Sequence, residues 1–324
     1  MTEKNPTIER PRPVMTTGLE SPENKRPLIG SRSERKFMGL ADSIGTITVD
    51  PNIVLTTSYD NGGLDRDTRI ERQNELTAQV KKEIYDFIAF RRSERGLDID
   101  IEAVEERLER ATAEIFQYSY DNRAGGYSSI LKDIYVYGDQ GDNYENVTHR
   151  LTHELMHAAS GQVYSVWAKE DKYSAPEKKV VGLRRDNKFG WLNEAFTELL
   201  TKGALSISPR LPEAKVGHYN QQQMLFDEMI RVSNIDLKLI YEAYFEEPKL
   251  DAPAGKRMPK WHALQSALND QFGPHFLEHI ENLIGGGVGS AELIKKLLEK
   301  DDKGNSGIDK IKQEWDSQQS YKIT

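Results

Sequence analysis

Apolar residues recur at helical spacing between residues 66 and 94, and the positions between them are mostly polar or charged. This pattern predicts a long amphipathic helix, which Gly96 ends. A second stretch with the same period follows Asp98 or Asp100, either of which can cap a helix, and predicts a helix that continues to about Phe116. The apolar stripes are Leu76, Val80, Ile84, Phe87 and Ile88 in the first stretch, and Ile101, Val104, Leu108, Ala111 and Ile115 in the second.

The period of the pattern then changes. Gly125-Gly126 indicates a turn, because paired glycines commonly mark one. The segment from Ser128 to Tyr137 is rich in isoleucine, valine and tyrosine, and it predicts one strand. A polar loop follows, and it ends in Asp142 or Asn143 as the expected N-cap of the next helix.

That next helix carries the pentapeptide HELMH at residues 153–157, and its apolar positions are expected to face inward. Residues 163–167 and 179–183 predict the two strands of a hairpin with a polar loop between them. A further helix is predicted from about Leu192 to Lys202, closed by Gly203. The remainder predicts helices at about 219–233, 235–245, 260–271, 273–284, 290–299 and 307–317.

Residues 1–58 differ in composition from the rest of the chain. Six of the thirteen prolines lie there, among serine, threonine and scattered charge. Such a segment buries too little apolar surface to offset its ordering entropy, so we expect a largely disordered tail, with short strands at 44–49 and 53–55 able to dock. The chain then divides into this tail, a helical segment at 59–120, a core at 121–205 and a helical C-terminal subdomain at 206–324. Together these segments predict an α+β fold.

Composition narrows the class of protein. The 324 residues carry 52 acidic and 44 basic side chains, for a net charge of -8, which gives no support for nucleic-acid binding. The apolar runs are too short for a membrane span. The chain has no cysteine, which excludes a Cys-ligated zinc finger and a disulfide. The first residues lack the apolar stretch of a secretory signal, so a cytoplasmic location is expected; the pattern does not indicate an oligomeric state.

The HELMH pentapeptide carries the clearest chemistry. Residues four apart lie on one face of a helix, so His153 and His157 can bind one metal ion. Glu154 is rotated to the side, where it can act on a water molecule as general base. Catalytic zinc keeps three protein ligands and an open position for water, so a zinc site is expected.

A second acidic motif supplies the missing ligand. Glu194 lies on the predicted helix 192–202 and is the expected third zinc ligand. Glu198 lies one turn later on the same face, where it is expected to accept a proton from a ligand imidazole, most simply that of His153. Asn193 is expected to hydrogen-bond nearby backbone or a ligand.

HELMH followed by WLNEAFTE, residues 191–198, resembles the gluzincin metallopeptidases, which include thermolysin and many aminopeptidases. The resemblance covers about 125–203 and is greatest to the small members called minigluzincins. It implies a zincin-like catalytic core in which an extended substrate adds to the strand before the active-site helix, here 128–137. It also implies a Tyr or His that stabilises the oxyanion, for which His218 and Tyr219 are candidates.

One feature departs from that pattern. Thirty-six residues separate His157 from Glu194, more than in thermolysin. The hairpin predicted at 163–183 would absorb them, because surface insertions cost little free energy. The longer spacing also leaves open that Glu198, in place of Glu194, is the ligand.

The expected function is a zinc-dependent peptidase acting on a peptide or protein substrate. The chain has no GxMEN-type signature of the aminopeptidases, which favours an endopeptidase. One alternative is a non-catalytic metal-binding module with the same fold that binds a peptide or protein partner. A second alternative is a structural helical protein in which HELMH has no chemical role.

Overall fold

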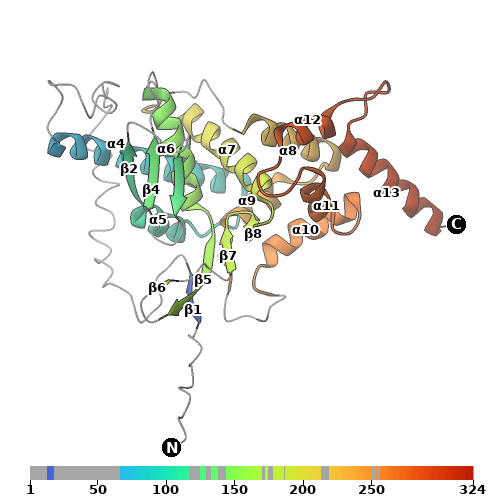
Figure 1. Cartoon of the computed structure of the whole chain (residues 1–324), viewed down its shortest axis with the longest axis horizontal. Coiled ribbons are helices and arrows are strands. Elements are labelled where there is room, and N and C mark those ends of the chain that lie inside the picture. Colours follow the sequence, from blue (N-terminus) through green and yellow to red (C-terminus); the bar gives the residue numbers. More distant parts are fainter. Residues whose placement is uncertain are drawn as a thin grey trace, which may run out of the picture.

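The computed structural model describes residues 13–17, 66–116, 125–128, 133–137, 144–169, 172–173, 178–185, 187–212, 219–249, 253 and 256–323. This part of the chain is a mixed α and β structure, mostly helical with small sheets, in agreement with the predicted class (Figure 1). No helix within it is both long enough and apolar enough to cross a membrane.

The first helices only partly follow the sequence pattern. Helix α4 (Arg66–Arg95) forms as predicted, with its apolar stripe buried. Helix α5 (Ile101–Arg110) is capped by Asp100, whose side chain accepts a hydrogen bond from the Ala103 amide. The prediction that α5 continues to Phe116 is wrong, because residues after Ala111 form strand β2 (Thr112–Phe116). Strand pairing with a distant segment overrides the local helical period there.

A three-stranded sheet lies beside the helices, with the strand order β2-β4-β3. Strands β2 and β4 (Asp133–Tyr137) are parallel, whereas β3 (Gly125–Ser128) and β4 are antiparallel. Two predictions are therefore wrong: Gly125-Gly126 belongs to a strand instead of a turn, and 128–137 is not a single strand. Most of the segment predicted to be the edge strand forms β4, which is the central strand of the sheet. Strand β3 lies at the edge.

Helix α6 (Tyr144–Ala159) packs against β3 and β4 of this sheet, and helix α7 (Gly190–Ile207) packs against α6 (Figure 1). The inward positions predicted for α6, at Val147, Leu151, Leu155 and Ala158, are fully buried. The prediction that Gly203 ends α7 is wrong, because Gly203 lies inside the helix. A Cβ at Gly203 would come within 2.8 Å of the Phe87 ring of α4, so glycine permits close packing of α4 on α7.

The segment between α6 and α7 forms the predicted hairpin. Strand β5 (Gln162–Lys169) pairs antiparallel with β7 (Lys178–Val181), and the short strands β6 (Lys172–Tyr173) and β8 (Arg184–Arg185) extend the two sides. Within the predicted tail, the structure describes only β1 (Pro13–Thr17), which pairs antiparallel with β5. The strands predicted at 44–49 and 53–55, and the caps Asp142 and Asn143, lie outside the described residues.

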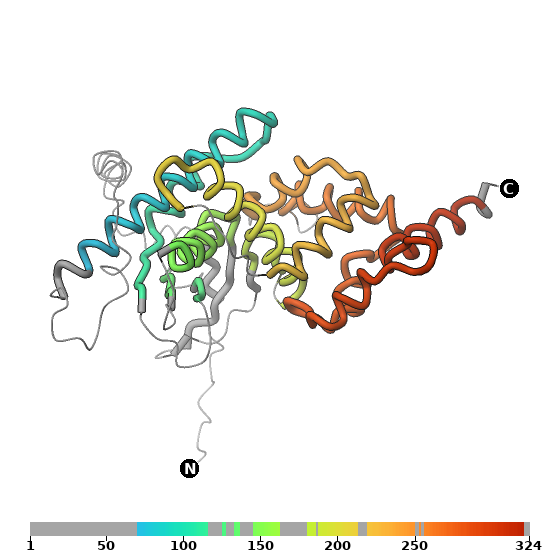
Figure 2. The backbone as a smooth tube through the Cα atoms, turned by 90° about the horizontal axis from the view of Figure 1, so that it is seen from above, coloured from blue at the N-terminus to red at the C-terminus, as the bar shows by residue number. Residues whose placement is uncertain are grey.

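The C-terminal part is helical, as predicted, and lies on the opposite side of α7 from the small sheet (Figure 2). Its helices are α8 (Asn220–Ser233), α9 (Leu237–Phe245), α10 (Pro259–Phe272), α11 (Phe276–Leu283), α12 (Ala291–Leu298) and α13 (Gly307–Ile323). Phe196 of α7 contacts the rings of Phe226, Tyr241 and Tyr244. Helix α7 is therefore packed on both sides, which holds its polar residues in fixed positions.

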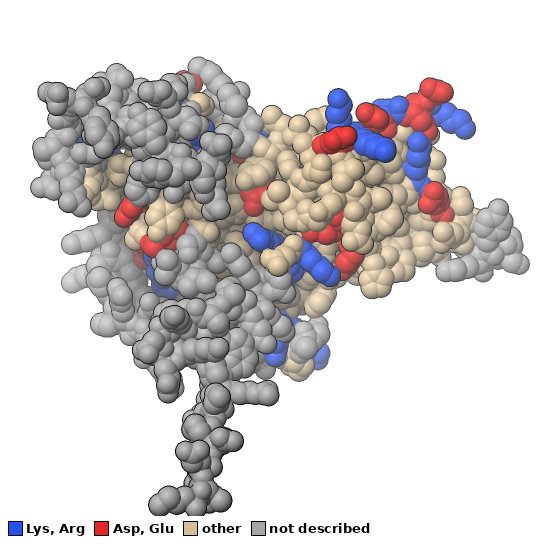
Figure 3. All heavy atoms as spheres, in the orientation of Figure 1, with Lys and Arg blue, Asp and Glu red and all other residues tan. Residues whose placement is uncertain are grey.

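The face of the molecule in Figure 3 shows acidic and basic side chains intermixed over the C-terminal helices. Among the described residues on that face, charge is not gathered into one continuous basic surface.

Candidate metal centre

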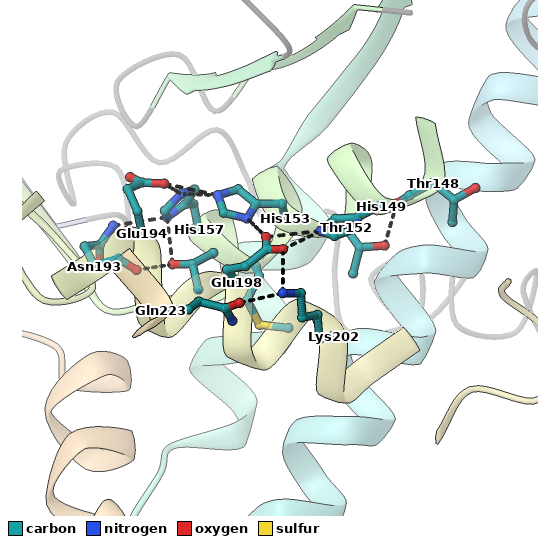
Figure 4. A network of polar contacts seen from close by, with 12 residues as sticks. Thr148, His149, Thr152, His153, His157, Asn193, Glu194, Glu198, Lys202 and Gln223 are labelled. Atoms are coloured by element: carbon teal, nitrogen blue, oxygen red, sulfur yellow. Dashed lines mark hydrogen bonds and ion pairs between the residues drawn. The ribbon is translucent and has the colours of Figure 1, made fainter. Parts of the chain in front are cut away.

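Helices α6 and α7 bring His153, His157 and Glu194 together (Figure 4). The two ring nitrogens Nε2 are 3.1 Å apart, and Glu194 Oε2 lies 3.1 Å from His153 Nε2 and 3.2 Å from His157 Nε2. All three residues are buried. Among the described residues no other group of three His, Cys, Asp or Glu side chains is arranged in this way.

The spacing of these atoms fits a metal ion. Ligand atoms about 2.0–2.1 Å from a tetrahedral zinc ion lie about 3.3 Å from one another. The distances between the three donor atoms, 3.1, 3.1 and 3.2 Å, are close to this value. A buried triangle of two imidazole nitrogens and a carboxylate could therefore hold a divalent cation.

The other ring nitrogen of His153 is held by Glu198. Its Nδ1 lies 3.0 Å from Glu198 Oε2, and the same oxygen also accepts from His149, whose Nε2 lies 3.1 Å away. A proton on Nδ1 leaves the lone pair of Nε2 directed at the metal position. Glu198 thus contacts the side of the ring opposite to Glu194, which leaves Glu194 as the carboxylate between the two Nε2 atoms.

Electrostatics in this cluster are strongly coupled. Burial alone would raise the pKa of Glu198, but hydrogen bonds from His149 and His153 lower it to about 2. Burial would lower the pKa of His153, yet hydrogen bonds to Glu194 and Glu198 raise it to about 10. The pKa of Glu194 is lowered: burial opposes this shift, but the two imidazoles outweigh it. The site therefore favours positive charge between the carboxylates.

His157 is held by residues of α7. Thr197 Oγ1 and Asn193 Nδ2 each lie 3.2 Å from its Nδ1. With Nε2 on a metal, Nδ1 carries the proton and donates it to Thr197 Oγ1, which can in turn donate to the Asn193 carbonyl at 2.8 Å. The Tyr244 hydroxyl of α9 lies 2.8 Å from the same Thr197 oxygen.

The sequence predicted Asn193 as a residue of the site, but it did not predict Thr197. Asn193 makes the backbone contact expected of it, because Oδ1 accepts from the Leu183 amide at 2.9 Å, while its Nδ2 lies 3.2 Å from His157 Nδ1. The roles of Thr197 and Tyr244 were not predicted. Thr197 follows Asn193 by one helical turn, which is a usable signal, but nothing in the sequence places Tyr244 near the site.

Glu154 lies in a pocket of about 210 Å³ beside the metal position. The pocket is also lined by His157, Glu194 and residues of β3. A Cβ at Gly125 would come within 3.2 Å of Glu154 Oε1, so strand β3 passes directly over this carboxylate. Burial raises the pKa of Glu154, although the neighbouring histidines act in the opposite direction. The prediction that 128–137 is the strand edge at the site is corrected to β3.

Tyr219 precedes α8 and lines the same pocket. Its ring stacks on His153 with 5.3 Å between centroids, and its hydroxyl bonds to Glu194. Burial, together with the nearby carboxylates, raises its pKa, so the phenol remains a hydrogen-bond donor. Tyr219 has φ 56°, a left-handed conformation uncommon for a non-glycine residue. The other candidate, His218, lies outside the described residues.

No family model matches the chain, and no match was found among curated proteins or solved structures.

Proposed function

We propose that the chain is a zinc-dependent peptidase of the gluzincin kind, with a zincin-like core formed by the β2-β4-β3 sheet, α6 and α7. The observation that carries this proposal is the convergence of His153 Nε2, His157 Nε2 and Glu194 Oε2 beside Glu154, which lines the same pocket. Two histidines and a carboxylate are a common ligand set of catalytic zinc, and a nearby free carboxylate is what hydrolysis requires. An endopeptidase remains favoured on sequence grounds.

Zinc held by these three residues would lower the pKa of water and polarise the substrate carbonyl. The remaining chemistry belongs to residues of the chain. Glu154 accepts a proton from the attacking water and delivers it to the leaving amine. Its raised pKa makes the carboxylate a stronger base toward the attacking water, and the carboxyl group so formed can then donate that proton to the leaving amine.

Tyr219 supplies a hydrogen bond to the oxygen that gains negative charge. Its hydroxyl is in the pocket and stays protonated at neutral pH, as the raised pKa requires. Such a donor acts most strongly on the transition state, where the charge is largest.

Strand β3 is the expected binding edge for the substrate backbone. It lies at the end of the sheet order, and Gly125, Gly126 and Tyr127 line the pocket. An extended peptide that pairs with β3 would place a carbonyl group near Glu154, because a Cβ at Gly125 would already contact that side chain.

The experiment compares wild type with Glu154→Gln. Zinc content is measured by elemental analysis, and cleavage is followed on a library of quenched fluorescent peptides. We expect both proteins to bind zinc and the variant to cleave at least about 100-fold more slowly, the usual contribution of a general base. Glu114→Gln, which changes an exposed carboxylate on β2, is the matched control and should cleave as wild type does.

The outcomes separate the proposal from its rivals. Equal cleavage by Glu154→Gln and wild type contradicts the mechanism. Stoichiometric zinc without turnover on any peptide favours the non-catalytic metal-binding module. Failure of wild type to bind zinc favours a structural protein.

A further inference from the structure

Arg184 introduces a positive charge into the wall of the pocket. It is the single cationic side chain among the residues that line the described pocket, whereas Glu154 and Glu194 supply two carboxylates. A divalent cation at the metal position would balance those two negative charges. The guanidinium of Arg184 then leaves the pocket with a net positive charge, which favours an anionic group on the substrate.

The turn that carries Arg184 is hydrogen-bonded to helix α7, which also carries Glu194. Arg184 pairs with Val181 across the β7–β8 turn. Within that turn, the Leu183 amide donates to Asn193 Oδ1 at 2.9 Å, one residue before the ligand Glu194. Gly182 has φ 56°, and it has no side chain to hold the turn away from Asn193. The position of Arg184 relative to the pocket is therefore fixed by the same residue that contacts His157.

The charge of Arg184 also acts on a carboxylate that does not line the pocket. That carboxylate is Glu281 of α11, where burial is the main effect and raises the pKa, while backbone hydrogen bonds and nearby cations lower it. The Glu281 carboxylate accepts from the amides of Phe189 and Gly287 at 3.0 and 2.8 Å. Arg184 therefore lines the pocket and is also near enough to Glu281 for its charge to lower the pKa of that carboxylate.

We propose that Arg184 is a specificity-determining residue that binds a carboxylate of the peptide substrate, either an Asp or Glu side chain or the C-terminal carboxylate. A guanidinium presents several donors in a plane, and it pairs well with a carboxylate. This inference rests on the proposed peptidase function for its substrate class. Binding of a carboxylate next to the metal can nevertheless be measured without turnover.

The first test measures binding to the zinc-loaded protein by calorimetry. The probes are the monohydroxamate of succinic acid, which joins a metal-binding group to a carboxylate, and its neutral carboxamide analogue. We expect wild type to bind the acid roughly ten- to hundredfold more tightly, as a charge-assisted hydrogen bond allows. In Arg184→Gln the preference disappears, while the affinity for the carboxamide stays the same.

Lys188→Gln is the matched control, because it removes an exposed positive charge four residues along the chain that does not line the pocket. It should retain the preference for the acid. The proposal is overturned if wild type shows no preference, or if Arg184→Gln keeps the preference of wild type.

The second test uses quenched peptides in which Glu replaces Gln at each position in turn, each made with a free acid or an amide at the C-terminus. A preference for Glu supports recognition of a side chain, and a preference for the free acid supports recognition of the chain end. Cleavage with no preference of either kind overturns the role of Arg184 and leaves the peptidase proposal standing. Carboxylate-dependent hydroxamate binding with no cleavage supports Arg184 and overturns the peptidase proposal.

Discussion

Replacing Gly182 with alanine tests how the β7–β8 turn supports the metal centre. Gly182 has φ 56°, and a Cβ at this position would lie 2.4 Å from Asn193 Oδ1 and 2.7 Å from the Tyr244 ring. Asn193 is buried on α7, and its amide group contacts both the Leu183 backbone and His157. The methyl group would have to displace Asn193, because the Tyr244 ring is also buried and packed.

Two costs add in this variant. A left-handed conformation costs a residue with a side chain about 1–2 kcal/mol. Displacing Asn193 leaves the buried Leu183 amide without its acceptor, which costs about 1–3 kcal/mol. We therefore expect Gly182→Ala to lower the free energy of unfolding by about 2–5 kcal/mol.

Gly96→Ala separates these two contributions. Gly96 has φ 58°, but a Cβ there would meet nothing within 4 Å, so that variant measures the backbone cost alone. Urea unfolding of the metal-free proteins gives both changes, provided that the slopes of the transitions agree. Zinc affinity should fall in Gly182→Ala and stay unchanged in Gly96→Ala. Equal destabilisation of the two variants would refute the packing argument.

Three further predictions concern the centre itself. Glu198→Gln should weaken zinc binding by roughly 10- to 100-fold in a chelator competition, because it removes the charged acceptor of His153; wild-type affinity would contradict this. Zinc binding at pH 7 should release a proton from His153, whose pKa is raised to about 10, and zinc affinity should rise with pH until that value is reached. Calorimetry in buffers of different ionisation heat measures this release, and identical heats would count against it. Tyr219→Phe should slow cleavage by roughly 100-fold with zinc affinity retained, whereas an unchanged kcat would exclude Tyr219 as the oxyanion donor.

Local patterns account for the parts of the structure that could be anticipated. His153 and His157 lie one helical turn apart, so their shared face follows from helix geometry alone. The same holds for Glu194 and Glu198 on α7, and for the apolar stripe of α4. These features need only the period of a helix, which the sequence displays directly.

Features that depend on distant pairing were not accessible in this way. Residues 112–116 continue the helical period of α5, yet they pair with β4 about twenty residues later. Gly125 and Gly126 carry the signal of a turn but extend along β4 as its antiparallel neighbour. In each case the pairing partner lies outside the window over which a period is read, so the local signal predicts the wrong element.

The contacts of the metal centre also divide into those that follow from local helical periods and those that depend on distant packing. The placement of Glu198 against His153 follows from two helical periods and the expected need for an acceptor. The approach of His149 to that same carboxylate, and of Tyr244 to Thr197, depends on how whole helices pack. Those contacts depend on the tertiary packing of α6, α7 and α9, which no local pattern of the sequence predicts.

The central claim is that His153, His157 and Glu194 hold one divalent cation. The most direct measurement is X-ray absorption at the zinc edge on protein supplemented with zinc and dialysed, with elemental analysis of the same sample. The account predicts one zinc ion per chain with nitrogen and oxygen neighbours at about 2.0–2.2 Å, and loss of that ion in His157→Ala. A wild-type protein that retains no zinc, or a His157→Ala variant that retains it with an unchanged spectrum, would contradict the claim.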